Sequence, residues 1–418
     1  MSFRGMCLLA VLLSLAAGAV ADPVPLFDPP VVYNFPGEAK TAAIGDLNGD
    51  GLDDVAVTAW PSSLYVLYQQ PDKTLGPPVQ LYSPIMPLAL AVGDLNQDSR
   101  LDLVVGGSNG SVPLYYQQSD GTFGLPDAGW GYGQVNSLVI DDFNGDGLND
   151  IADTSATFAS VLVSLQAPGG TFGLPASYAL NGFNSRSICA LDYNSDGIRD
   201  LACLVDDSIC YLAGIGDGTF AEPLYLPATW GYALAAGDVT GDGKDDLVFT
   251  VPDSTGYGTV TVFPQGTDGQ PASPQFYPAY DYAQALALAD LDGDGRKDVA
   301  AVHSGWEALT VTRQNADGTL GQWSPYTIPY GNDYQCGALA VGDLNADGNP
   351  DIAVADPWNG LIVLPHTAAT VGPLPDTTAP VCTASVSGTT GLNGWYVSDV
   401  TVTLSAEDEA EGSGLGSI

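Results

Sequence analysis

Seven short segments of the chain carry aspartate and asparagine side chains at the spacing of a cation-binding loop. The first, residues 46–54, reads Asp-Leu-Asn-Gly-Asp-Gly-Leu-Asp-Asp. The pattern Asp-x-Asn-x-Asp-Gly-x-x-Asp offers side-chain oxygens at positions 1, 3, 5 and 9, with glycine at position 6, where a tight loop needs a positive φ. Oxygen donors in such a loop suit a hard divalent cation, and we predict calcium.

The pattern is a repeat. It starts again at 48, 48, 50, 46, 52 and 53 residues from the preceding start, by subtraction. A period of this length is typical of a repeat architecture. An EF-hand would need a glutamate at position 12 and flanking helices, whereas here the last acid stands at position 9 and β-prone runs flank the loop. The six further copies begin at Asp94, Asp142, Asp192, Asp238, Asp290 and Asp343.

The composition agrees with many cation sites in a folded protein. The 418 residues include 49 acidic and 10 basic side chains, for a formal charge of −39, yet 45% of the residues are hydrophobic, enough for a packed core. The motif copies place 22 aspartates at ligand positions. Because these carboxylates would repel one another, we expect bound divalent ions to contribute to stability. Nucleic acid is excluded as a partner by the negative charge.

The segments around each motif predict the elements that position it. A run of small apolar residues precedes the loop, a β-prone run follows it, and two further runs come after polar or glycine-rich turns, as at residues 64–68 and 120–124. Helical periodicity with caps is absent, and 51 glycines and 30 prolines interrupt the chain. Four strands repeated seven times predict an all-β fold, a seven-bladed β-propeller over residues 22–369.

The ends of the repeat region predict how the ring closes. After the last motif, strands are expected at residues 352–354 and 361–364, but none follows before Pro373. Residues 31–35 stand before the first repeat where each fourth strand stands before the next motif. We therefore predict that this N-terminal segment pairs with residues 361–364, and that deleting residues 22–36 destabilises the protein strongly.

The two termini read differently from the repeats. Residues 1–21, with Arg4, an apolar run and Ala19-Val20-Ala21, predict a secretory signal peptide of bacterial type, and hence a secreted or cell-surface protein. No later run is long enough for a transmembrane segment. Residues 370–380 predict a proline-containing linker, and residues 381–418 are too short for a complete β-sandwich.

Three cysteines fall in one repeat. Cys189, Cys203 and Cys210 lie on what we expect to be three adjacent strands. In an exported protein one disulfide among them is reasonable, and buried free thiols are equally so. The sequence leaves both alternatives open.

With these motifs in place, residues 30–366 resemble the FG-GAP/VCBS family, the calcium-loop propeller repeats of integrin α-subunit heads and of many secreted bacterial proteins. The resemblance implies a loop between the first and second strands of each blade and up to seven Ca²⁺ ions per chain. Transferred position by position, it implies these ligands: Asp46, Asn48, Asp50, Asp54; Asp94, Asn96, Asp98, Asp102; Asp142, Asn144, Asp146, Asp150; Asp192, Asn194, Asp196, Asp200; Asp238, Thr240, Asp242, Asp246; Asp290, Asp292, Asp294, Asp298; Asp343, Asn345, Asp347, Asp351.

Two copies depart from the family pattern. Ser99 replaces glycine at position 6 of the second loop, which costs the left-handed turn about 1 kcal/mol, and Thr240 replaces asparagine or aspartate in the fifth loop. We expect these two sites to be the weaker ones and the sixth, with four aspartates, to be the tightest. The tail, with Asp376-Thr-Thr-Ala-Pro380 and Gly394-Trp395-Tyr396, resembles the start of an Ig-like repeat of bacterial surface proteins.

Residues for catalysis are scarce. The chain has two histidines, His303 and His366, and neither has a patterned partner. No nucleophile elbow, zinc motif or phosphate loop occurs. We expect the protein not to be an enzyme; Glu307, beside Trp306, is the best remaining candidate for a polysaccharide-active site.

Aromatic residues mark the face opposite the predicted calcium loops. Trp60, Trp306 and Trp358 fall in loops between second and third strands, and further aromatic residues fall between fourth and first strands. Large side chains also pack between blades, but exposed rings around a propeller mouth suit a ligand. We predict a monomeric extracellular binding or adhesion module with these tryptophans as ligand residues. A glycan-binding lectin is the alternative, and a polysaccharide-active enzyme the third reading.

Overall fold

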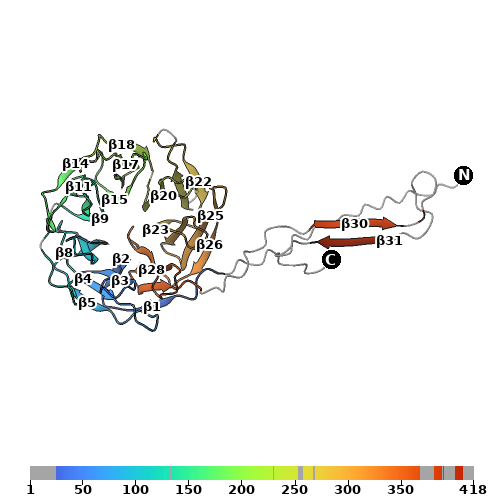
Figure 1. The fold of residues 1–418 in the computed structure, drawn as a ribbon, viewed down its shortest axis with the longest axis horizontal. Helices are drawn as coiled ribbons and strands as arrows, with labels where there is room; N and C mark the ends of the chain where they lie inside the picture. The colour runs from blue at the N-terminus through green and yellow to red at the C-terminus, as the bar shows by residue number, and fades with distance from the viewer. Residues whose placement is uncertain are drawn as a thin grey trace. The chain divides into compact units, whose positions relative to one another are not determined.

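The computed structural model describes residues 25–127, 129–130, 133–228, 230–252, 258–266, 269–367, 381–387, 389 and 401–407. The chain divides into two compact units, one of which is Leu26–Thr367. This unit is a ring of seven antiparallel sheets, each the blade of a propeller (Figure 1). The prediction of an all-β, seven-bladed propeller is confirmed, because every element of the described residues is a strand.

The blades follow one another in sequence, and in each the first strand lies toward the centre of the ring. The strands of the first three blades are β2 (Glu38–Gly45), β3 (Asp54–Trp60), β4 (Ser63–Leu67) and β5 (Val79–Tyr82); β6 (Pro87–Gly93), β7 (Asp102–Gly107) and β8 (Leu114–Tyr115); and β9 (Val135–Asp141), β10 (Asp150–Ser155), β11 (Ser160–Ser164) and β14 (Ala176–Ala179). A small hairpin of β12 (Gln166–Ala167) and β13 (Thr171–Phe172) lies between β11 and β14 in the chain.

The remaining four blades keep the same order. Their strands are β15 (Ser185–Leu191), β16 (Asp200–Val205), β17 (Ser208–Leu212) and β18 (Leu224–Pro227); β19 (Leu234–Gly237), β20 (Asp246–Pro252), β21 (Gly258–Phe263) and β22 (Gln275–Pro278); β23 (Ala283–Ala289), β24 (Asp298–His303), β25 (Ala308–Gln314) and β26 (Leu320–Thr327); and β27 (Leu339–Gly342), β28 (Asp351–Asp356), β29 (Gly360–Leu364) and β1 (Val31–Tyr33).

The second blade differs from the expected four strands. Its sheet has three, and the segment where a fourth is expected makes only the isolated bridges Gln117↔Phe123 and Leu114↔Asp127. That segment contains Gly124 and Pro126. The third blade has the same Thr-Phe-Gly-Leu-Pro run at residues 171–175 and still forms the regular strand β14, so glycine and proline alone do not explain the difference.

The ring is closed by the N-terminal strand, as predicted. In the seventh blade β1 pairs with β29, with Val31 opposite Val363 and Tyr33 opposite Leu361. Just before β1, the buried Phe27 forms a further bridge with His366. The first and last parts of the propeller therefore share one sheet.

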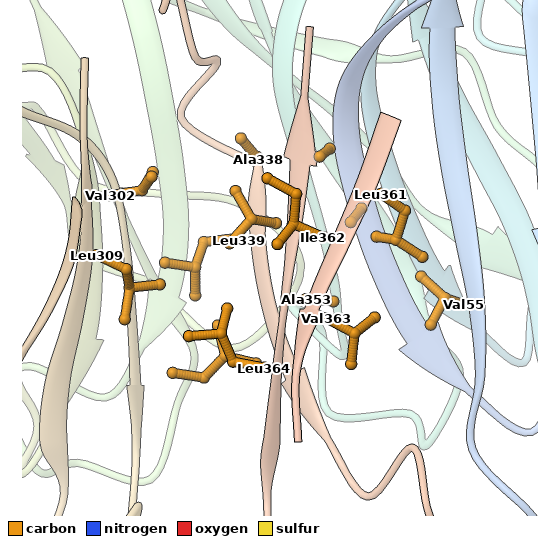
Figure 2. Packing of buried hydrophobic residues seen from close by; sticks show 14 of the residues in the cluster. Val55, Val302, Leu309, Ala338, Leu339, Ala353, Leu361, Ile362, Val363 and Leu364 are labelled. Carbon is orange, nitrogen blue, oxygen red and sulfur yellow. The ribbon is translucent and has the colours of Figure 1, made fainter. Parts of the chain in front are cut away.

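The core around this closure is continuous across three blades. Figure 2 shows Leu361 and Leu364 of the seventh blade lying between Val55 of the first blade and Leu309 of the sixth. All four side chains are fully buried. Burial of such aliphatic side chains between neighbouring sheets is what holds blade to blade.

Several predicted segments lie outside the described residues or are described only in part. The signal segment 1–21 and the linker 370–380 lie outside them. Within residues 381–418, β30 (Val381–Ser387) and β31 (Thr401–Glu407) form an antiparallel pair, and the Ig-like assignment stays a prediction. Where the chain is described, it contains no helix that is long and apolar enough to cross a membrane.

The cysteines of the fourth blade are free thiols. Cys203 of β16 stands directly opposite Cys210 of β17, and both are buried. Cys189 of β15 is also free. Of the two alternatives left open by the sequence, the structure has buried thiols.

Candidate functional site

All seven acidic loops connect the first and second strands of their blades. The first loop, for example, leaves β2 at Gly45 and enters β3 at Asp54. In every blade the aspartate at position 9 is the first residue of the second strand. The loops therefore lie on one face of the ring, as the resemblance implies.

Within each loop the backbone wraps around the first carboxylate. Oδ1 of Asp46 accepts a hydrogen bond from the Gly49 amide at 2.6 Å, and its Oδ2 accepts one from the Gly51 amide at 2.9 Å. Oδ1 of Asp50 accepts from the Leu52 amide at 2.9 Å. These bonds hold the side chains of positions 1 and 5 in the turn, so that their remaining lone pairs can take a cation.

The donor set fits a hard divalent cation. In the sixth loop, carboxylate oxygens of Asp290, Asp292 and Asp294 all lie within 4.8 Å of one another. Oδ1 of Asp292 and Oδ1 of Asn345, both at position 3, are buried and accept no hydrogen bond from any described residue. Buried oxygens without a partner are rare and require an explanation. An oxygen-coordinated ion such as calcium would supply the missing partner.

Arginine side chains lie against two of the loops. Arg296 contacts Asp294, and Nε of Arg313 lies 3.5 Å from Oδ2 of Asp292. In the second loop Arg100 contacts Asp98 in the same way. A cation entering the sixth loop must compete with two guanidinium groups. These two arginine contacts count against the expectation that the sixth loop binds its cation most tightly. That expectation stays a prediction.

The acidic loops have a positive φ at two positions, 6 and 4. Ser99, at position 6, has φ of 63°, so the left-handed turn is kept without glycine. Position 4 also needs a positive φ, which sequence reasoning missed. Non-glycine residues adopt it in three loops, at Gln97, Ser195 and Ala346. The signal was available, since the other four loops have glycine at position 4.

The aspartate at position 9 joins the loop to the third strand. Oδ2 of Asp54 accepts from the Leu47 amide at 3.0 Å, and its Oδ1 accepts from the Gln69 amide at 2.7 Å. Burial raises the pKa of Asp54 to about 7, against the opposing effect of these hydrogen bonds. Burial likewise raises the pKa of Asp298 and of Asp351 to about 7. A bound cation would favour the charged form.

Side chains just after the third strands of two blades each bond to the acidic loop of a neighbouring blade. Nε2 of Gln117, in the second blade, donates to the backbone carbonyl of Asp46 at 3.1 Å. Nε2 of Gln69, in the first, donates to the carbonyl of Asp343 in the seventh at 2.8 Å. These interblade bonds were not predicted, although glutamine occupies this place in five of the seven repeats.

The three predicted ligand tryptophans are exposed on the opposite face. Their exposed fractions are 42% for Trp60, 48% for Trp306 and 71% for Trp358. Tyr280 lies 5.7 Å from the ring of Trp306, and Tyr330 lies 6.4 Å from that of Trp358, both edge to face. The structure thus places the tryptophans on the first, sixth and seventh blades, two of them with a tyrosine neighbour.

The candidate catalytic residues occupy different surroundings. His303 is fully buried, with Nδ1 3.0 Å from the carbonyl oxygen of Asp281 and Nε2 2.8 Å from Oγ1 of Thr310. Burial lowers its pKa to about 4, so it is neutral at pH 7. Glu307 is exposed in the loop between β24 and β25. His303 therefore packs within a blade, while Glu307 faces solvent.

Solved structures with the same fold include lectins. The chain resembles an Agrocybe aegerita lectin, described as recognising non-reducing terminal N-acetylglucosamine, at 18% identity, with a TM-score of 0.52 and coverage of 70% of this chain and 81% of that one. It resembles the BP39L lectin of Burkholderia pseudomallei at 17% identity, with a TM-score of 0.63 and coverage of 80% and 98%. At these identities the likeness shows the fold alone.

A third neighbour has a different role. BBS1N, solved in complex with ARL6DN, is 11% identical, with a TM-score of 0.56 and coverage of 82% of this chain and 97% of that one. Among curated proteins no match to the sequence was found. The fold is therefore shared by sugar-binding and protein-binding chains.

The repeats themselves have a family model. It is described as the FG-GAP-like repeat and matches residues 46–105, 94–152, 142–203, 192–249, 238–301 and 290–354. Each match runs from one acidic loop to beyond the next, so the loop, the strand order and the spacing are matched together. The chain belongs to the FG-GAP-like repeat family.

Proposed function

We propose that this protein is a glycan-binding propeller of lectin type, whose ring is stabilised by calcium in the acidic loops. The observation that carries the proposal is the exposed pair Trp358 and Tyr330 on the face opposite those loops. Aromatic faces bind the apolar faces of sugar rings while polar neighbours take the hydroxyl groups. The two lectins of similar fold support this reading over the adhesion module expected first.

The Trp358 loop is fixed by hydrogen bonds. Oδ1 of Asp356 accepts from the backbone amides of Trp358 and Asn359, each at 2.8 Å. Nδ2 of Asn359 donates to the carbonyl oxygen of Tyr330 at 2.9 Å, which joins the loop to the segment before the seventh blade. A loop held this way loses little conformational entropy on binding.

Polar side chains surround these rings. Asn332 is exposed near Tyr330 in the chain, and its Oδ1 bonds to the Ser304 hydroxyl in the loop that contains Trp306. Amide and hydroxyl groups suit sugar hydroxyls, whereas a surface for a protein partner has an apolar centre of several contiguous side chains. The exposed rings with polar neighbours therefore favour a glycan.

Calcium has a structural part in this proposal. When bound, it would neutralise the carboxylates of each loop and hold positions 1, 3, 5 and 9 together. Because Gln69 and Gln117 bond to the carbonyl groups of neighbouring loops, ordering of one loop would also orient the next blade. The aromatic face would then bind its ligand on a rigid support.

A glycan array probed with the whole protein tests the proposal. We expect binding that weakens about threefold to tenfold in Trp358→Ala, as the loss of one aromatic contact predicts. Trp306→Ala and Trp60→Ala report on the other two positions. Phe276→Ala is the matched control, because Phe276 is 67% exposed but lies on the outer strand β22. An array without signal, or signal equally reduced by Phe276→Ala, would overturn the proposal.

A further inference from the structure

A cavity of about 520 Å³ opens at the hub of the ring, where the first strands begin. It is lined from five blades, including Asn136 of β9, Arg186 of β15 and Gln284 of β23. Figure 1 shows these strands around the centre of the ring. Since the acidic loops follow the ends of the same strands, the cavity lies on the face opposite to them, on the side of the tryptophans.

Arg186 is the only basic residue among the described residues that line this cavity. Among the described residues its guanidinium makes no ion pair or hydrogen bond, although five other basic side chains pair with carboxylates. Instead it stands 4.3 Å from the centre of the Tyr232 ring, which in turn meets Tyr282 edge to face at 4.4 Å. In a chain with a charge of −39, an arginine without a carboxylate partner is unusual.

The backbone directs Arg186 into the cavity. The pairing of β15 with β16 shifts register between Ser185 and Ser187, so Arg186 is the extra residue of a bulge. Gln284 occupies the same place in the sixth blade, where the register shifts between Ala283 and Ala285. A bulge turns a side chain away from its regular alternation, and such bulges are common beside binding sites.

Other groups in the lining complete a polar pocket. Ser185 is fully buried, and its hydroxyl has no hydrogen-bond partner within the described part of the chain. Nδ2 of Asn136 donates to the Ser185 carbonyl at 2.8 Å, which holds the amide at the wall. Phe183, exposed to 69%, supplies an aromatic ring at the rim. Asp333 is the single acidic side chain in the described part of the lining.

We propose that this hub cavity binds a carboxylated sugar, with the guanidinium of Arg186 taking the carboxylate and the surrounding amide and hydroxyl groups taking the ring hydroxyls. Arginine binds carboxylates through two parallel hydrogen bonds. The Tyr232 ring fixes the guanidinium plane without using its N–H groups, so these stay available for a ligand. The inference rests on the proposed glycan binding and names a ligand class for a second position on the same face.

Titration calorimetry of the whole protein with galacturonic acid, and with galactose as its neutral counterpart, tests the inference. We expect galacturonic acid to bind more tightly than galactose. Arg186→Gln should weaken galacturonic acid binding about tenfold to a hundredfold, as expected for loss of a hydrogen bond to a charged group. Arg186→Lys keeps the positive charge but cannot form the two parallel hydrogen bonds. Its affinity for galacturonic acid should lie between that of the parent and that of Arg186→Gln.

Lys73→Gln is the matched control. It removes the same charge from an exposed turn in which Lys73 Nζ bonds to the Ala346 carbonyl of the seventh acidic loop, on the opposite face. We expect its affinity for galacturonic acid to be unchanged. The inference would be overturned if the two sugars bound equally or if neither bound. It would also be overturned if Arg186→Gln had the parent's melting temperature and the parent's affinity for galacturonic acid. The array result with Trp358→Ala judges the proposed function separately, because Trp358 does not line the cavity.

Discussion

Replacing Phe27 by alanine tests whether the N-terminal segment closes the ring. Phe27 precedes the closing strand β1 and is only 4% exposed. Its ring meets Tyr326 of the sixth blade at 5.2 Å and His366 of the seventh at 5.7 Å, both edge to face. The side chain thus joins the N-terminal segment to the last two blades of the propeller.

The expected loss can be worked from these contacts. Removing a buried phenylalanine ring costs about 3–5 kcal/mol, including the cavity left behind. The unit Leu26–Thr367 has 342 residues, and at about 2.1 cal/mol/K of unfolding entropy per residue this loss corresponds to roughly 4–7 °C in melting temperature. Deleting residues 22–36 also removes the three pairs of β1, so it should cost more.

Thermal unfolding followed by circular dichroism measures the effect. Phe276→Ala is the control, because that ring is largely exposed on β22 and its loss should shift the midpoint by less than about 1 °C. If Phe27→Ala melts with the control, closure by the N-terminal segment does not contribute to stability and the reasoning is wrong.

Three further predictions concern the loops and the core. Chelation of divalent cations should lower the melting temperature, and added calcium should restore it by mass action; an unchanged midpoint would count against calcium in the loops. Ser99→Gly should raise the free energy of unfolding by about 0.5–1 kcal/mol and Gly147→Ser, at φ of 82° with open space around it, should lower it by about 1 kcal/mol, both measured in urea. Burial raises the pKa of Asp153 to about 7, above its value in the unfolded chain, so the free energy of unfolding falls as pH rises from about 4 to 7. The variant Asp153→Asn should therefore be more stable than the parent protein at pH 8 and similar to it at pH 4. Equal urea midpoints of the two proteins at pH 8 would contradict this.

The repeats made the fold predictable because each copy has the same order of apolar run, acidic loop and β-prone runs. Position 9 had to begin a second strand, as Asp54 does, and the strand missing after residue 364 had to come from elsewhere. Those inferences need only the order of elements along the chain. The positive φ at position 4 could also have been predicted, because four of the seven copies have glycine there.

What could not be predicted depends on neighbours in space. The bond from Gln117 to the Asp46 carbonyl joins two blades through one side chain, and no pattern within a single repeat specifies it. The hub cavity is formed where five blades converge, and Arg186 enters it through a register shift that alternation does not show. The three-stranded second blade could not be predicted either, because the run of residues at 122–126 occurs again at 171–175, where a regular fourth strand follows.

The closing strand also sets an order of events during synthesis. Val31 pairs with Val363, 332 residues later by subtraction, so the first strand of the propeller must wait for the last strand of the propeller. The other blades draw their strands from neighbouring sequence and can form while the chain is still emerging. Until β1 returns, β29 keeps an open edge that the β1 of a second molecule fits equally well. At high concentration, ring closure therefore competes with exchange of this strand between two copies.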